Sequence, residues 1–183
     1  MENKRATMTL ADSLIAELTQ EAATTRRVLE RVPEEKLSWA PHPKSMSLGQ
    51  LSLHIAGLPR GIVELLSELT AEVPTVALPE ATSVDEILSA LDEGLAVATA
   101  KLTEWGDEGL TAEWTMTRGA DTVLAMPRVA MVRTIMLNQI YHHRGQLTVY
   151  LRLLDVPVPP VYGPTADEDP FGRSNSGMRR SGG

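Results

Sequence analysis

Apolar side chains recur at steps of three or four positions along four long stretches of the chain. This period is typical of amphipathic helices that bury one face. The four stretches span residues 10–29, 48–69, 87–102 and 132–154. We therefore expect an all-α protein, built as a bundle of four helices.

Local signals place the ends of these helices. Ser47 precedes Gln50 by three residues, and Ser83 precedes Glu86 in the same way, so both pairs predict a capping box at a helix start. Pro59 lies inside the second apolar stretch and is expected to kink the helix or split it.

The hydrophobic period changes between the third and fourth helices. Trp114, Met116 and Val123 flank the turn-forming segment 118–121, which predicts a short β-hairpin there. After Asp155 the chain becomes rich in proline and then polar. We expect residues 1–155 to form the helical domain and residues 156–183 to form an extended arm with a flexible tail.

Composition narrows the functional classes. A net charge of −7 over 183 residues, without a contiguous basic patch, argues against a nucleic-acid partner. The chain has no cysteine, so thiolate metal sites, disulfides and cysteine nucleophiles are excluded. It shows neither a signal sequence at its start nor a long apolar run, and we expect a cytoplasmic protein without a membrane partner.

Two polar residues interrupt the apolar stripe of the last helix. Gln139 and His143 are four positions apart, so both face the same side of a helix, and His54 lies at the border of the stripe on the second helix. We interpret these three residues as ligands of one divalent metal ion, with positions left open for water or substrate. The expected stripe of the last helix is Val132, Ile135, Met136, Gln139, His143, Gln146, Leu147, Tyr150 and Leu154.

The alternative is that these polar residues only satisfy one another inside the core, as hydrogen-bonded polar residues do in other bundles. On either interpretation Arg144 is expected to point outward, and His42 to lie in a surface loop. The acidic residues 167–169 are expected to be a solvated run. Apolar residues expected on the exterior, and therefore at a homodimer contact, are Leu66, Met131 and Ile140.

Three longer segments resemble the DinB/YfiT-like superfamily of metal-dependent enzymes. They are residues 39–51 leading to His54, residues 142–152 beginning His-His-Arg-Gly-Gln-Leu, and residues 162–168 beginning Tyr-Gly-Pro. The resemblance implies a four-helix bundle in up-down-down-up order that is commonly dimeric. It also implies a divalent metal, such as zinc, nickel or manganese, held by one residue of helix two and two of helix four.

Mapped onto this chain, the family's metal ligands fall on His54, Gln139 and His143, with Gln139 at a position where relatives usually have histidine. Similar proteins act as transferases or isomerases that use low-molecular-weight thiols. The expected function is therefore a metal-dependent transferase or hydrolase acting on a small molecule. The alternative is a non-catalytic dimer whose polar pocket binds a small ligand or is only structural.

Overall fold

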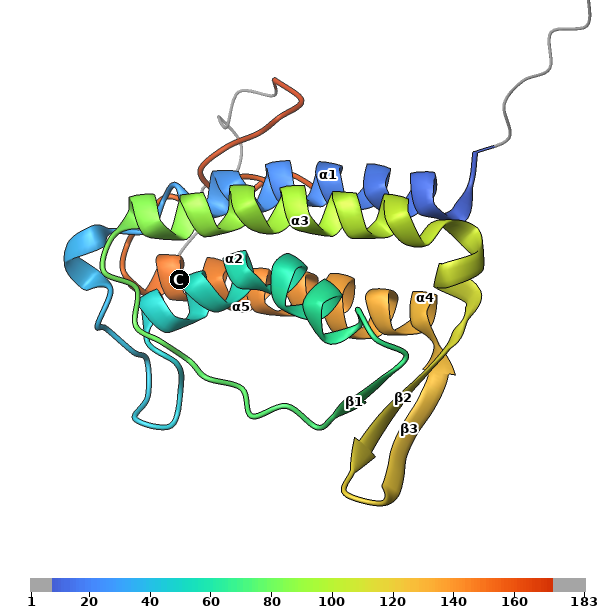
Figure 1. The fold of residues 1–183 in the computed structure, drawn as a ribbon. Helices are drawn as coiled ribbons and strands as arrows, with labels where there is room; N and C mark the ends of the chain where they lie inside the picture. Colours follow the sequence, from blue (N-terminus) through green and yellow to red (C-terminus); the bar gives the residue numbers. More distant parts are fainter. Residues whose placement is uncertain (1–7, 173–183) are drawn as a thin grey trace, which may run out of the picture.

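Four long helices form most of the computed structural model, which describes residues 8–172 (Figure 1). They are α1 (Leu10–Leu29), α2 (Leu48–Leu65), α3 (Val84–Thr111) and α5 (Asn138–Leu153). In Figure 1, α1 lies beside α3 in one layer and α2 lies beside α5 in the other. The hydrophobic period thus predicted the four helices, whereas the all-α class must be amended to a mostly helical fold with a small sheet.

Side-chain caps fix where the helices begin. The predicted capping box of α2 is confirmed, because Ser47 Oγ accepts a hydrogen bond from Gln50 N and Gln50 Oε1 accepts one from Ser47 N. The box predicted for α3 is only half formed. Ser83 Oγ accepts from Glu86 N, but the Glu86 carboxylate turns to the backbone N–H and hydroxyl of Thr82.

α2 continues through Pro59 without the predicted split. Its packing against α3 is close: a Cβ added to Gly94 would lie 3.1 Å from the carbonyl oxygen of Ala56. Because burial against α3 holds both sides of the proline, losing one backbone hydrogen bond does not end the helix.

The predicted hairpin is confirmed and belongs to a larger sheet. β2 (Glu113–Arg118) pairs antiparallel with β3 (Asp121–Pro127), and Gly119 in the turn has the positive φ of 60° that glycine tolerates. The short strand β1 (Thr70–Glu72), which no sequence pattern indicated, pairs parallel with β2. The strand order is β1-β2-β3.

Irregular backbone precedes the hairpin and follows it. α3 is interrupted at Gly106, where φ is 54° and ψ is −166°. After β3 the chain forms α4 (Arg128–Met131), a π-helical segment η2 (Val132–Leu137) and then α5. A π-helix has a wider turn than an α-helix, so η2 changes which side chains the last helix presents to the core.

The buried face of the last helix therefore differs from the predicted stripe. Its most deeply buried residues from η2 onward are Val132, Met136, Leu137, Ile140, Arg144, Leu147 and Leu151. Gln139 and His143 are only half-buried, so they lie at the edge of the core. Leu66, Met131 and Ile140 were expected on the exterior, but all three are buried within the chain.

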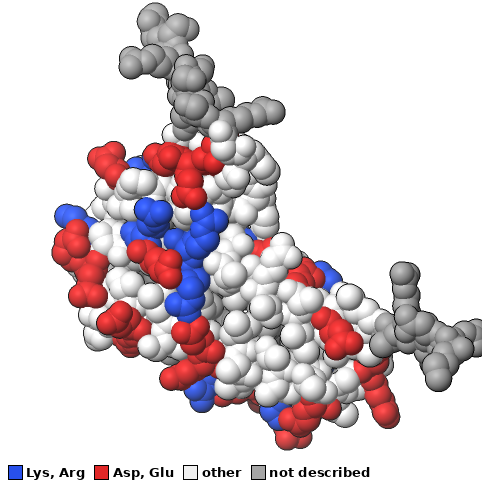
Figure 2. Space-filling model, turned by 90° about the horizontal axis from the view of Figure 1, so that it is seen from above, with Lys and Arg blue, Asp and Glu red and all other residues white. Residues whose placement is uncertain are grey.

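The arm after α5 packs against the helices. In this arm Val158, Pro159 and Pro160 are buried. Elsewhere, a short helical turn, η1 (Glu34–Lys36), lies in the connection after α1. The acidic run is not simply solvated, because Asp167 pairs with Arg152 and Glu168 pairs with Arg27. Basic and acidic side chains also lie side by side on the face shown in Figure 2. The domain boundary at residue 155 stays a prediction, and the tail beyond residue 172 lies outside the described residues.

Among residues 8–172, every helix is too short or too polar to cross a membrane.

Candidate metal centre

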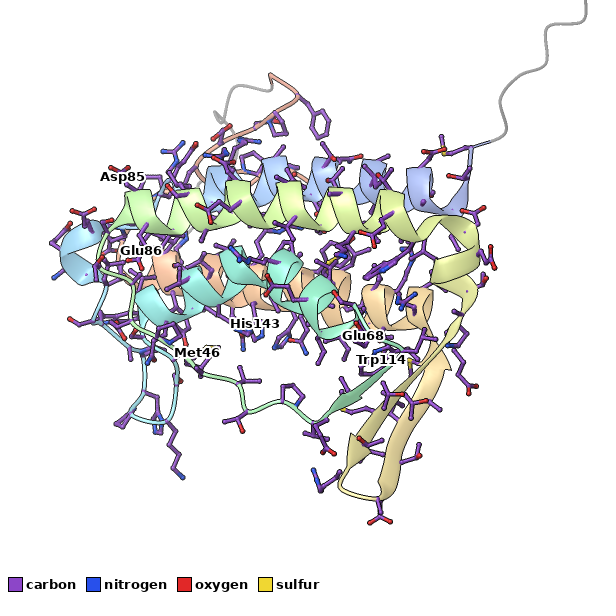
Figure 3. The ribbon with its side chains drawn as sticks, in the orientation of Figure 1. Met46, Glu68, Asp85, Glu86, Trp114 and His143 are labelled. Atoms are coloured by element: carbon purple, nitrogen blue, oxygen red, sulfur yellow. The ribbon has the colours of Figure 1, made fainter. Side chains whose placement is uncertain are left out.

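His54 of α2 and His143 of α5 meet, as the sequence predicted. Their ring centroids are 4.8 Å apart, with the rings at 81° to one another. In Figure 3 His143 lies on the side of α5 that faces the connection between β1 and α3. Two histidines about 90 residues apart in sequence therefore share one locus at the edge of the core.

Gln139 reaches the same locus. It lies one helical turn before His143, and all three predicted ligands line one cavity of about 380 Å³. The remainder of that wall is apolar: Met46, Leu58, Ile62, Leu65, Pro74, Val76, Leu78, Met116 and Ile135. The structure thus brings together every residue that the sequence nominated for the site.

Burial favours the neutral form of both imidazoles. Desolvation lowers the pKa of His54 below its ordinary value, and the neighbouring His143 lowers it further. Desolvation also lowers the pKa of His143, partly opposed by its hydrogen bond to Gln146. A neutral imidazole has the free lone pair that a metal ion or a proton donor requires.

The hydrogen bond between His143 and Gln146 sets the orientation of one ring. His143 Nδ1–H donates to Gln146 Oε1 at 2.7 Å, which leaves Nε2 as the free nitrogen. This is the arrangement in which a second residue fixes the tautomer of a metal-binding histidine. Gln146 was expected in the buried stripe of the helix but is exposed, and its spacing of three from His143 could have indicated the contact.

The distance between the His54 and His143 rings is one that a shared ion would allow. A metal–nitrogen bond of about 2.1 Å puts an imidazole centroid about 3.2 Å from the metal, so ligands at 90–110° have centroids roughly 4.5–5.2 Å apart. The observed 4.8 Å lies within this range. Within residues 8–172 no cluster of three or more His, Asp or Glu side chains could hold a metal ion, so the third protein ligand would have to be the amide oxygen of Gln139.

The two other histidines are outside this centre. The His142 ring is exposed and contacts His143 edge-on, with centroids 4.9 Å apart, so it forms the solvent side of the site. His42 lies in an exposed loop, as predicted, and its Nδ1 accepts a hydrogen bond from Lys44 N.

Arg144, the neighbour of His143, corrects the sequence analysis. It was expected to point outward, but its side chain is only 1% exposed. Its guanidinium donates to the Glu21 carboxylate at 2.7 Å, to Thr25 Oγ1 at 3.1 Å and to the hydroxyl of Tyr162. The expected outward direction was wrong because the core side of α5 lies around Ile140 and Leu147, on the same side as Arg144.

Glu21 is the second charged residue that the sequence analysis missed. It lies on the buried face of α1 between Leu18 and Ala22. A carboxylate within a helical apolar stripe was the available signal, because such a group needs a buried cationic partner. The Arg144–Glu21 pair joins α5 to α1.

Comparison with known proteins agrees with this architecture. The profile of the DinB family matches residues 1–170. The YrdA protein of Bacillus subtilis strain 168 is 28% identical over 150 residues, which cover 81% of this chain and 85% of that protein.

Two solved structures share the fold. A DinB-like protein from Bacillus cereus ATCC 10987 superimposes with a TM-score of 0.68 at 28% identity, covering 85% of this chain and 99% of its own. The DinB-like protein YjoA from Bacillus subtilis gives a TM-score of 0.63 at 18% identity, covering 81% and 96%. Because the family profile matches residues 1–170 and a DinB-like protein shares the fold, the chain belongs to the DinB family.

Proposed function

We propose that this protein is a divalent-metal-dependent transferase or hydrolase of the DinB type, acting on a small molecule. His54, Gln139 and His143 hold the ion, which is zinc, nickel or manganese. In this proposal the four long helices are the up-down-down-up bundle of the family, the protein is a homodimer, and a low-molecular-weight thiol is a candidate substrate. The observation that carries the proposal is the approach of two neutral imidazoles from separate helices at the wall of a cavity.

Each residue has a distinct task. The two histidines present ring nitrogens, Gln146 orients the His143 ring, and apolar side chains line the rest of the cavity. A bound divalent ion supplies Lewis acidity, which lowers the pKa of a coordinated water or thiol toward neutral pH. The polar end of the cavity is therefore where a substrate would react.

Calorimetric titration of metal-free protein, purified without a histidine tag, tests the proposal. We expect one zinc, nickel or manganese ion to bind per chain, and His54→Ala and His143→Ala to abolish binding. His42→Ala is the matched control, because it removes an exposed loop histidine and should bind as the parent does. Failure of all three metals to bind the parent would overturn the proposal.

A second candidate follows from the donor set, since an amide oxygen is a weaker ligand than imidazole or carboxylate. In this candidate the protein is a non-catalytic dimer whose pocket binds a small ligand or is structural. EDTA would then leave the melting temperature of the parent unchanged. His143→Ala would cost about 1–3 kcal/mol of unfolding free energy, without any part that depends on metal.

A further inference from the structure

The cavity at the histidines has a second lobe. This lobe has a volume of about 370 Å³ and extends along α2 past Gly57 and Gly61. The two lobes share seven wall residues along α2 and the segment 74–78, which are His54, Leu58, Ile62, Leu65, Pro74, Val76 and Leu78. Each lobe alone has a volume in the range of about 300–1,000 Å³ that is usual for small-molecule sites.

The lining of both lobes is apolar except at the histidine locus and at Thr75. No Asp, Glu, Lys or Arg is among the residues that line either lobe. The polar side chains are His54, Gln139 and His143 at the junction and in the first lobe, and Thr75 in the second. A ligand body carrying a carboxylate or an ammonium group would lose its hydration there without gaining a partner.

The second lobe lies between the glycines of α2, which form its floor, and residues 74–78, which form its roof. A Cβ built on Gly57 or Gly61 meets no atom within 4 Å, so the two glycines leave open space on α2 beside His54. Residues 74–78 form the roof, held at its ends by Val73 N bonded to Thr117 O and by Gln50 Nε2 bonded to Leu78 O. Val76 and Leu78 line the cavity with apolar side chains that are still 63% and 40% exposed.

We propose that this cavity binds a substrate with an uncharged alkyl or aryl body, which lies in the glycine-floored lobe and places its polar end at His54, Gln139 and His143. This inference deepens the proposed function, because it assigns the substrate class for the same site.

Straight-chain alcohols are suitable probes, since they carry one polar end and no charge. We would titrate metal-free protein with 1-butanol, 1-hexanol and 1-octanol, and follow the assigned methyl resonances of methionine by NMR. Met46 and Met116 line the histidine lobe, whereas Met8 is exposed and Met131 is buried elsewhere. We expect shifts confined to Met46 and Met116, with affinity rising about fourfold for each added methylene.

Gly57→Leu should fill the second lobe and weaken 1-octanol binding at least tenfold, and Gly57→Ala should weaken it by a smaller factor. Both changes suit a helix, so the fold should be retained. Ala100→Leu is the matched control, because it adds the same side chain to an exposed position of α3. It should leave octanol binding unchanged.

Binding that is independent of chain length, or unaffected by both Gly57 variants, would overturn the inference. Equal weakening in Ala100→Leu would do the same. The proposed function fails in a different experiment: metal titration of the parent, which needs no alcohol. If the protein binds octanol but no metal, the proposed substrate class stands and the proposed metalloenzyme is rejected. If it binds metal but no octanol, only the proposed substrate class is rejected.

Discussion

At His54 and His143, burial acts against the charged form of each side chain. The pKa of both groups is lowered from the ordinary value near 6.5, mainly by desolvation. The unfolded chain therefore binds protons at these positions at a higher pH than the folded chain does. The free energy of unfolding therefore decreases as the pH is lowered through about 6.5. Once the pH is below the lowered pKa values of the folded protein, these two histidines make no further difference to it.

We expect the melting temperature of the metal-free protein in EDTA to fall between about pH 7 and pH 5.5. The double variant His54→Gln/His143→Gln lacks both groups, so its melting temperature should depend less on pH in this interval. Differential scanning calorimetry at closely spaced pH values measures both curves. Parallel curves for parent and variant would show that these imidazoles do not titrate as the structure indicates.

Gln139 offers the opposite kind of test, a gain of affinity. Imidazole is a stronger ligand for zinc and nickel than a neutral amide oxygen, so Gln139→His should tighten metal binding by about tenfold or more. Gln139→Leu, which provides no donor atom, should weaken it. Calorimetric titration of the three proteins gives the order His, Gln, Leu if residue 139 is a ligand, and equal affinities if it is not.

The sequence predicted the three candidate ligands because helical spacing is a local property. Gln139 and His143 lie on one side of a regular helix whatever that helix packs against. The buried side was not predictable in this way. It depends on the π-helical segment before residue 138 and on the partner helices, so Arg144 was assigned to the exposed face and Gln146 to the buried one.

Among the helices, the contact between α1 and α5 depends on a buried ion pair. Arg144 bonds to Glu21 and Thr25 on α1 and to Tyr162 of the arm, so one guanidinium joins three segments. Removing one partner of such a pair leaves the other charge buried and uncompensated. Removing one partner of this pair should lower the free energy of unfolding more than breaking any exposed ion pair on the same helices does.

Arg144→Met should therefore lower the free energy of unfolding by about 3–5 kcal/mol. The double variant Glu21→Met/Arg144→Met removes both charges and should be more stable than the single one. Urea denaturation of the parent, both single variants and the double variant provides the thermodynamic cycle. Additive losses in the double variant would mean that the two side chains are not coupled.

Substitution of Gly106 tests whether the interruption of α3 requires glycine at this position. Its φ of 54° and ψ of −166° lie in a region that is almost restricted to glycine, so Gly106→Ala should cost about 1–3 kcal/mol. Gly145→Ala is the control, since Gly145 lies within α5 and an added Cβ meets no atom within 4 Å there. It should stabilise the helix by about 0.5–1 kcal/mol. Urea denaturation distinguishes a strained position from an ordinary helical one.

For the whole molecule, local signals predicted the helices and the hairpin, and tertiary contacts account for what they missed. Strand β1 contains only three residues and exists because Thr70–Glu72 lie along β2. The arm is held by partners distant in sequence, since Arg27 donates to Glu168 and the Tyr162 hydroxyl donates to Glu21. Neither arrangement has a repeating pattern in the sequence, so neither could be predicted from periodicity.

The expected homodimer must depend on other residues than the sequence analysis named. Val149 and Leu153 are one turn apart on α5 and are 56% and 58% exposed, which makes an apolar strip on one helix face. Single exposed apolar residues are ordinary, but adjacent ones of this size are typical of contact surfaces. We therefore expect a dimer at micromolar concentration in which a second copy of the chain covers this strip.

Leu153→Glu would place a charge in that contact and should shift the protein to monomer in sedimentation velocity experiments. Val123→Glu is the matched control: Val123 is 50% exposed and belongs to β3, not to α5, and its variant should remain dimeric. A monomeric parent would reject the dimer itself. A parent and a Leu153→Glu variant that are both dimeric would instead place the contact on another face, because a buried unpaired carboxylate at this position could not be tolerated.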